Sequence, residues 1–95
     1  MNEIIKILSK IDGGNVLDAA TGKGDFITTL KQHLKSYTQI IGVDSSARCV
    51  DYAQKIFPEN NIEIFRMNLE DMQFEDNYFD LVCMSDALHH IKNRE

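Results

Sequence analysis

The sequence contains no long apolar run and no cluster of basic residues. Its apolar stretches fall well short of the ~18 residues that mark a membrane-spanning helix. No run of Lys and Arg reaches three residues, so the charge pattern typical of a nucleic-acid-binding protein is missing. The N-terminus also lacks a basic region followed by an apolar core, and we therefore expect no signal peptide. These absences predict a protein with neither a membrane span nor a nucleic-acid partner.

Cysteine is scarce as well. The two cysteines, Cys49 and Cys83, are too far apart in the sequence to match a zinc or redox motif. Both lie in apolar surroundings, which is typical of buried free thiols. Because free thiols persist in the reducing cytosol, the cysteine pattern predicts a cytoplasmic protein without a metal site.

The composition is that of a soluble globular domain. The chain has 95 residues, of which 43% are hydrophobic and 26% are charged. Fifteen acidic residues against 10 Lys and Arg give a net charge of -5, which favours solubility. A chain of this length predicts one domain, spanning residues 1–95.

Short apolar runs alternate along the chain with segments of helical periodicity. The apolar runs predict strands at 15–20, 39–44, 62–67 and 79–84. Helical spacing predicts helices at 4–11, 25–34 and 47–57, a short helical turn at 68–72 and a further helix beginning within 87–95. Strands that alternate with helices indicate parallel crossovers and an α/β sheet. The third strand alternates more than the others, so we expect it at an edge of the sheet.

A small polar or acidic residue stands at or near the end of each predicted strand. These residues are Asp18, Asp44, Asn68 and the pair Ser85 and Asp86. In open α/β sheets, ligands bind just outside the carboxyl ends of the strands. The four strand ends therefore predict a polar binding site along one rim of the sheet.

Two glycines follow the first strand and suggest what that site holds. Gly22 and Gly24 allow a ligand to approach the backbone closely at the start of a helix. Asp44, at the end of the second strand, is placed to accept hydrogen bonds from ribose hydroxyls. A dinucleotide fingerprint requires a third glycine at the position of Ile27. Its absence favours a methyl-donor site, with an NAD-type site as the less favoured alternative.

Four segments resemble the motifs of class I S-adenosylmethionine-dependent methyltransferases. Residues 16–25 resemble the first motif and 41–46 the second, while 68–82 and 87–91 resemble later segments. The form Ala-Thr-Gly-x-Gly-Asp of the turn is similar to that of the ubiquinone/menaquinone biosynthesis branch. The resemblance implies a Rossmann-like parallel sheet with strand order 3-2-1-4 and flanking helices. It also implies methyl transfer from S-adenosylmethionine to a small-molecule acceptor.

The resemblance assigns the methionine part of the cofactor to the glycine turn. The backbone around Ala20, Gly22 and Gly24 would hold it, and Asp18 would shape the turn. Ala20 stands where the family usually has glycine, and a negative φ would allow an alanine there.

The resemblance assigns the nucleoside part to the next two strand ends. Asp44 would take the ribose hydroxyls and Ser45 would pack beside the adenine. Asn68 stands where the family usually has Asp, so its carbonyl oxygen would meet the adenine amino group. Leu69 would supply a backbone contact, and Ser85 would lie near the sulfonium.

The residues assign no catalytic group. Methyl transfer needs a base only where the acceptor has a proton to lose. His89, His90 and Asp86 are the candidates, although the two histidines also fit an ordinary pair at the start of a helix.

The number of strands predicts an incomplete domain. The family's sheet usually has seven strands, and this sequence accounts for four. We therefore expect the N-terminal part of a larger fold, with residues 81–84 as an exposed apolar edge. Such an edge could self-associate or be covered by a second chain. It also leaves open a non-catalytic, methyltransferase-like module that serves as an interaction domain.

Overall fold

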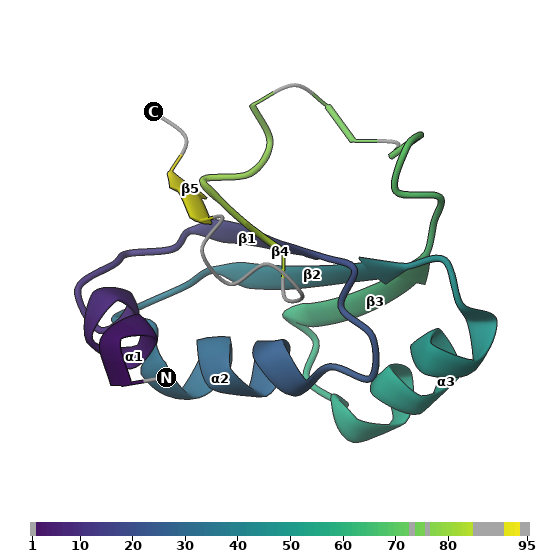
Figure 1. Ribbon diagram of the computed structural model, residues 1–95, viewed down its shortest axis with the longest axis horizontal. Helices are drawn as coiled ribbons and strands as arrows, with labels where there is room; N and C mark the ends of the chain where they lie inside the picture. Colours follow the sequence, from purple (N-terminus) through teal and green to yellow (C-terminus); the bar gives the residue numbers. More distant parts are fainter. Residues whose placement is uncertain (1, 73, 76, 85–90, 94–95) are drawn as a thin grey trace.

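A computed structural model of the chain describes residues 2–72, 74–75, 77–84 and 91–93. Within these residues, three helices and five strands follow one another (Figure 1). They are α1 (Asn2–Leu8), β1 (Asn15–Ala19), α2 (Asp25–His33), β2 (Gln39–Asp44), α3 (Ala47–Ile56), β3 (Ile62–Arg66), β4 (Leu81–Met84) and β5 (Ile91–Asn93).

The strands form a single sheet in the order β3-β2-β1-β4-β5. Strands β1 to β4 are parallel, which confirms the α/β class and the predicted order 3-2-1-4. Strand β3 lies at an edge, as its alternation predicted, and its burial alternates over Ile62–Phe65. The carboxyl ends of β1 and β2 therefore lie side by side.

Two predictions for the end of the chain are wrong. Residues 91–93 form a strand instead of a helix, and this strand pairs antiparallel with β4. Strand β4 is therefore not an open edge, and Leu81 and Cys83 are both buried. The physical reason is that β4 would otherwise present unpaired N–H and C=O groups beside apolar side chains. Self-association of the chain through β4 stays a prediction. The open edge strand on which that prediction was based is not present, because β4 pairs with β5.

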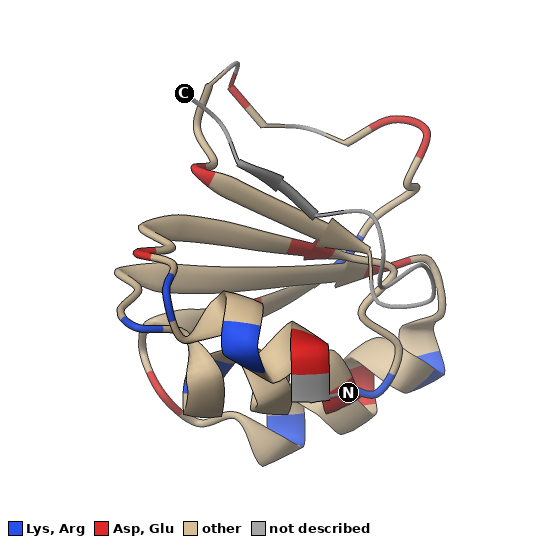
Figure 2. Ribbon diagram, turned by 60° about the vertical axis from the view of Figure 1, so that its left-hand side comes forward, with Lys and Arg blue, Asp and Glu red and all other residues tan. Residues whose placement is uncertain are grey.

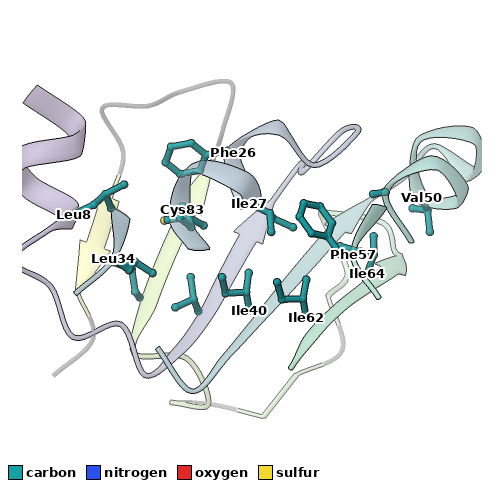
Figure 3. Close-up of a cluster of buried hydrophobic side chains, with 14 residues drawn as sticks. Leu8, Phe26, Ile27, Leu34, Ile40, Val50, Phe57, Ile62, Ile64 and Cys83 are labelled. Carbon is teal, nitrogen blue, oxygen red and sulfur yellow. The ribbon is translucent and has the colours of Figure 1, made fainter. Parts of the chain in front are cut away.

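The three helices cover one face of the sheet (Figure 1). Apolar stripes on α2 and α3 point toward the strands and form the larger core with them (Figure 3). Its members include Leu8, Phe26, Ile27, Leu34, Ile40, Val50, Phe57, Ile62, Ile64 and Cys83. This layer fixes the position of the turn that joins β1 to α2.

The opposite face of the sheet is covered by the connection between β3 and β4. Its smaller core consists of Leu17, Ala19, Ile41, Val43 and Phe79. In Figure 1 this connection arches over the side of the sheet away from the helices. Over 68–71 it forms one hydrogen-bonded turn, with Asp71 N donating to Asn68 O at 2.9 Å, and no helix.

Candidate functional site

The turn after β1 is closed by two backbone hydrogen bonds. Thr21 N donates to Val43 O at 2.8 Å, and Gly24 N donates to Thr21 O at 2.9 Å. Within this turn Ala20, Gly22 and Gly24 all have positive φ, at 58°, 58° and 93°. The expectation of a negative φ at Ala20 is wrong, because the chain reverses directly after the strand. A left-handed alanine costs roughly 1–2 kcal/mol, which the surrounding bonds of the turn offset.

Asp18 lies beneath this turn and is fully buried in β1. Its Oδ2 accepts a hydrogen bond from Thr21 Oγ1 at 2.7 Å. Because both side chains are buried, this bond ties the turn to the strand in a low-dielectric environment. The geometry is the one expected of a residue that shapes the turn.

Cys83 lies opposite Asp18 in the neighbouring strand β4. Burial, and then the nearby negative charge of Asp18, raise the pKa of the Cys83 thiol to about 12. The thiolate is the nucleophilic form of cysteine, so Cys83 is an inert core residue at neutral pH.

Asp44 connects the end of β2 to the glycine turn. Its Oδ2 accepts from Gly22 N at 2.8 Å, and its Oδ1 accepts from Ser46 N at 2.9 Å. Ser46 in turn caps α3 by accepting from Cys49 N at 3.3 Å, which confirms the predicted helix start. Each carboxylate oxygen has a further lone pair, so Asp44 can still accept hydrogen bonds from a ligand.

The two glycines of the turn differ in what surrounds them. A Cβ at Gly24 would lie 2.6 Å from the ring of Phe57, so this glycine allows α2 to pack closely on α3. Among the described residues, a Cβ at Gly22 would meet nothing within 4 Å. The backbone of Gly22 is therefore open to a ligand, beside the carboxylate that holds its N–H.

The position of the missing third glycine is filled by a core contact. Ile27 is fully buried, and its Cδ1 would lie 2.7 Å from a Cβ placed on Gly42 of β2. The small residue that lets helix and sheet approach is thus in the strand and not in the helix. The turn therefore lacks the geometry of a dinucleotide fingerprint, because the Ile27 side chain packs against Gly42 where the fingerprint has a glycine in the helix.

A hollow of about 390 Å³ adjoins Asp44 at the ends of β2 and β3. Its lining residues are Ser45, Arg66, Met67 and Asn68. Two hydrogen bonds fix its wall, from Met67 N to Asp44 O at 2.9 Å and from Arg66 Nε to Ser45 O at 3.1 Å. Its volume is within the ~300–1,000 Å³ typical of small-molecule pockets.

The structure thus brings most of the predicted site residues together, in two adjoining parts. Asp18, Ala20, Gly22, Gly24 and Asp44 belong to the turn and its clamp, while Ser45 and Asn68 line the hollow. Leu69 packs against the smaller core instead of lining the hollow with its side chain. Ser85, Asp86, His89 and His90 lie outside the described residues.

Sequence reasoning missed three residues that shape this region. Thr21 stands within the motif, three positions after Asp18, and that spacing alone could have indicated their hydrogen bond. Arg66 and Met67 directly precede Asn68 at the end of β3, but no pattern in the sequence marked them as lining residues. Among the described residues there is no group of three or more His, Cys, Asp or Glu side chains that could hold a metal ion.

Comparisons with known proteins agree with this geometry. A family model described as a methyltransferase domain matches residues 16–95. The chain is 34% identical over 83 residues to a 2-phytyl-1,4-naphtoquinone methyltransferase of Nostoc, covering 83% of this chain and 36% of the relative. It is 31% identical over 93 residues to a demethylmenaquinone methyltransferase of Porphyromonas gingivalis, covering 94% of this chain and 38% of the relative.

A solved structure shares the fold. The S-adenosylmethionine-dependent methyltransferase of Mesorhizobium loti superposes with a TM-score of 0.72 at 22% identity, over 87% of this chain and 37% of that one. The chain thus spans somewhat more than a third of the length of the curated relatives it matches.

Proposed function

This chain belongs to the methyltransferase-domain family, and from that premise we propose that it is the donor-binding part of a methyltransferase. In this proposal residues 1–95 form one unit that binds S-adenosylmethionine at the carboxyl ends of the parallel strands. The observation that carries the proposal is the Asp44 carboxylate, held 2.8 Å from the N–H of Gly22 beside open space.

The residues at the rim fit such a donor from one end to the other. The free lone pairs of Asp44 suit two ribose hydroxyls, and the open backbone at Gly22 suits the methionine portion. The adjoining hollow, lined by Ser45 and Asn68, suits the adenine base. The backbone of Leu69 adds a contact there in this proposal, and Ser85 lies toward the sulfonium.

When bound, the donor supplies an electrophilic methyl group on a sulfonium. The work of the chain is then to bind, to orient and to exclude water, which are the main demands of an in-line displacement. The backbone of Ala20 and Gly22 would contact the donor and orient it. Asp18 and Thr21 keep that backbone in place through their buried hydrogen bond.

The acceptor that we propose is a small molecule, as in the quinone methyltransferases to which the chain is similar. The connection over 67–80 contains no Lys or Arg, and Figure 2 shows acidic segments along it, while most of the blue segments lie on the helices and the loops beside them. This distribution does not favour a nucleic-acid acceptor at that face.

No helix in the described part of the chain is long and apolar enough to cross a membrane. The two free cysteines support a cytoplasmic location.

Calorimetric titration with S-adenosylmethionine, S-adenosylhomocysteine and NAD tests the proposal. We expect both methionine cofactors to bind and NAD to give no heat beyond dilution. Binding of NAD, without a response to either methionine compound, would contradict a methyl-donor site.

A further inference from the structure

The described side chains around the hollow offer more hydrogen-bond donors than acceptors. Of the four described residues that line it, Met67 is apolar and Ser45 has a hydroxyl that serves in either direction. The other two are Arg66 and Asn68, and their hydrogen bonds decide what they can offer to a base.

Asn68 has already used one of its two acceptor positions. Its Oδ1 accepts from Glu70 N at 2.9 Å. A backbone N–H can only donate, so the amide atom that it meets must be the oxygen and not the nitrogen. What remains on Asn68 is Nδ2, which donates two hydrogen bonds, and the second lone pair of Oδ1.

An aspartate in the same place would offer acceptors alone. One of its oxygens would accept from Glu70 N, as Oδ1 of Asn68 does, and the other would replace Nδ2 as an acceptor. An exchange of Asn for Asp at position 68 therefore replaces a hydrogen-bond donor on the side of the hollow with an acceptor, and leaves the shape of the hollow unchanged.

Arg66 adds to the same character. Its Nε donates to Ser45 O at 3.1 Å, and its guanidinium has donors but no acceptor. Arginine pairs well with the carbonyl oxygen and N7 of a purine base, and amide acceptors pair with the 6-amino group of adenine.

We propose that this hollow discriminates only weakly between adenine and a 6-oxo purine such as hypoxanthine. The inference rests on the proposed function, because it concerns the base of the bound donor. Adenine presents a 6-amino donor, whereas hypoxanthine presents a 6-oxo acceptor that Asn68 and Arg66 can meet. Asn68 is thus a specificity-determining residue of the site.

Titration of the protein with S-adenosylhomocysteine and S-inosylhomocysteine measures this preference. We expect the adenosyl compound to bind less than about tenfold more tightly than the inosyl compound. In Asn68→Asp this preference should grow at least fivefold, because a carboxylate accepts from the amino group and repels the 6-oxo group. A larger preference in the unmodified protein, or a smaller change in Asn68→Asp, would overturn the inference.

Two controls keep the outcome clear. Asn60→Asp adds the same charge at an exposed site before β3 and should leave the preference unchanged. Asn68→Asp keeps the hydrogen bond to Glu70, so its thermal unfolding should match that of the unmodified protein. If S-adenosylhomocysteine itself does not bind, the proposed function fails and this inference with it. If it binds while the preference ignores position 68, only the inference fails.

Discussion

Two glycine and carboxylate pairs lie at opposite ends of the sheet and have the same local chemistry. Gly22 follows β1, and its N–H is bound by Asp44 at 2.8 Å. Gly14 precedes β1, and the N–H of the next residue, Asn15, is bound by Asp80 at 2.9 Å. Both glycines are left-handed, with φ of 58° and 60°. A carboxylate beside a left-handed glycine is therefore not by itself the mark of a ligand site.

The two pairs differ in the space around the glycine. A Cβ at Gly14 would lie 2.2 Å from the Oδ2 atom of Asp80, so the carboxylate itself fills that side. Tyr78 closes the end further, since its hydroxyl donates to Gln39 at 2.7 Å. A Cβ at Gly22 would meet no atom of the described residues within 4 Å. The open side of the turn, and not the hydrogen bond, is therefore what separates the proposed binding end from the other end.

Alanine substitution at the two glycines should give the largest effect. Gly14→Ala combines a left-handed alanine with overlap on Asp80, which predicts a loss of roughly 2–5 kcal/mol in the free energy of unfolding. Gly22→Ala has only the backbone cost, roughly 1–2 kcal/mol. Urea unfolding of both variants measures the difference. Equal losses would mean that the two turns are equally filled.

Removal of the two carboxylates should separate binding from stability. Asp44→Ala should weaken S-adenosylhomocysteine by about 1–3 kcal/mol, because charged hydrogen bonds to the ribose are lost. Asp80→Ala should lower stability by about 1 kcal/mol and leave the affinity unchanged. Calorimetric titration and urea unfolding of each variant measure these effects. An unchanged affinity in Asp44→Ala would remove this residue from the site.

Cys83 lies in the buried layer between the two ends of the sheet, and its thiol should make the free energy of unfolding decrease at alkaline pH. The folded pKa, about 12, is above the ordinary value of 9.0. The contribution of the Cys83 thiol to the free energy of unfolding is therefore fully present below about pH 9. It is lost as the pH rises toward 12, because only the unfolded thiol ionises in that range. Between pH 8 and 10 the unmodified protein should lose about 1 kcal/mol more than Cys83→Ala. Parallel losses in urea unfolding would contradict the shifted pKa.

A weaker contact supports the open turn from its outer side. The Lys23 ammonium lies 5.4 Å from the centroid of the Tyr52 ring, and that ring is 50% exposed. Tyr52→Leu should therefore lower stability by no more than about 0.5–1 kcal/mol, and Tyr52→Phe should retain most of the interaction. Thermal unfolding distinguishes them, and equal losses in both variants would argue against a role for the ring.

Much of the fold could be predicted because each parallel strand is a short, largely apolar run that alternates with segments of helical periodicity. The order of the first four strands came from the resemblance to class I methyltransferases, whereas β3 shows its edge position in its own alternation. Strand β5 could not be predicted. Its three residues are too few to show a hydrophobic period. It forms because it pairs with β4, and that pairing cannot be recognised from the local sequence.

Sequence could predict that Asp44 and Gly22 lie together, because both follow the carboxyl ends of neighbouring parallel strands. Sequence could not show that Ala20 is left-handed, because that follows from how the turn closes on Val43. It also could not show that Oδ1 of Asn68 is bound by Glu70 N, which leaves the side chain more donors than acceptors for a ligand. Both depend on bonds made only after the strands are assembled.

The backbone amide signals of Gly22 and Gly14 in ¹H–¹⁵N spectra test the central claim most directly. On titration with S-adenosylhomocysteine, the Gly22 signal should shift to saturation while the Gly14 signal stays in place. The same titration with NAD should move neither. A saturable shift at Gly14, with Gly22 unmoved, would contradict the assignment of the open turn as the binding end.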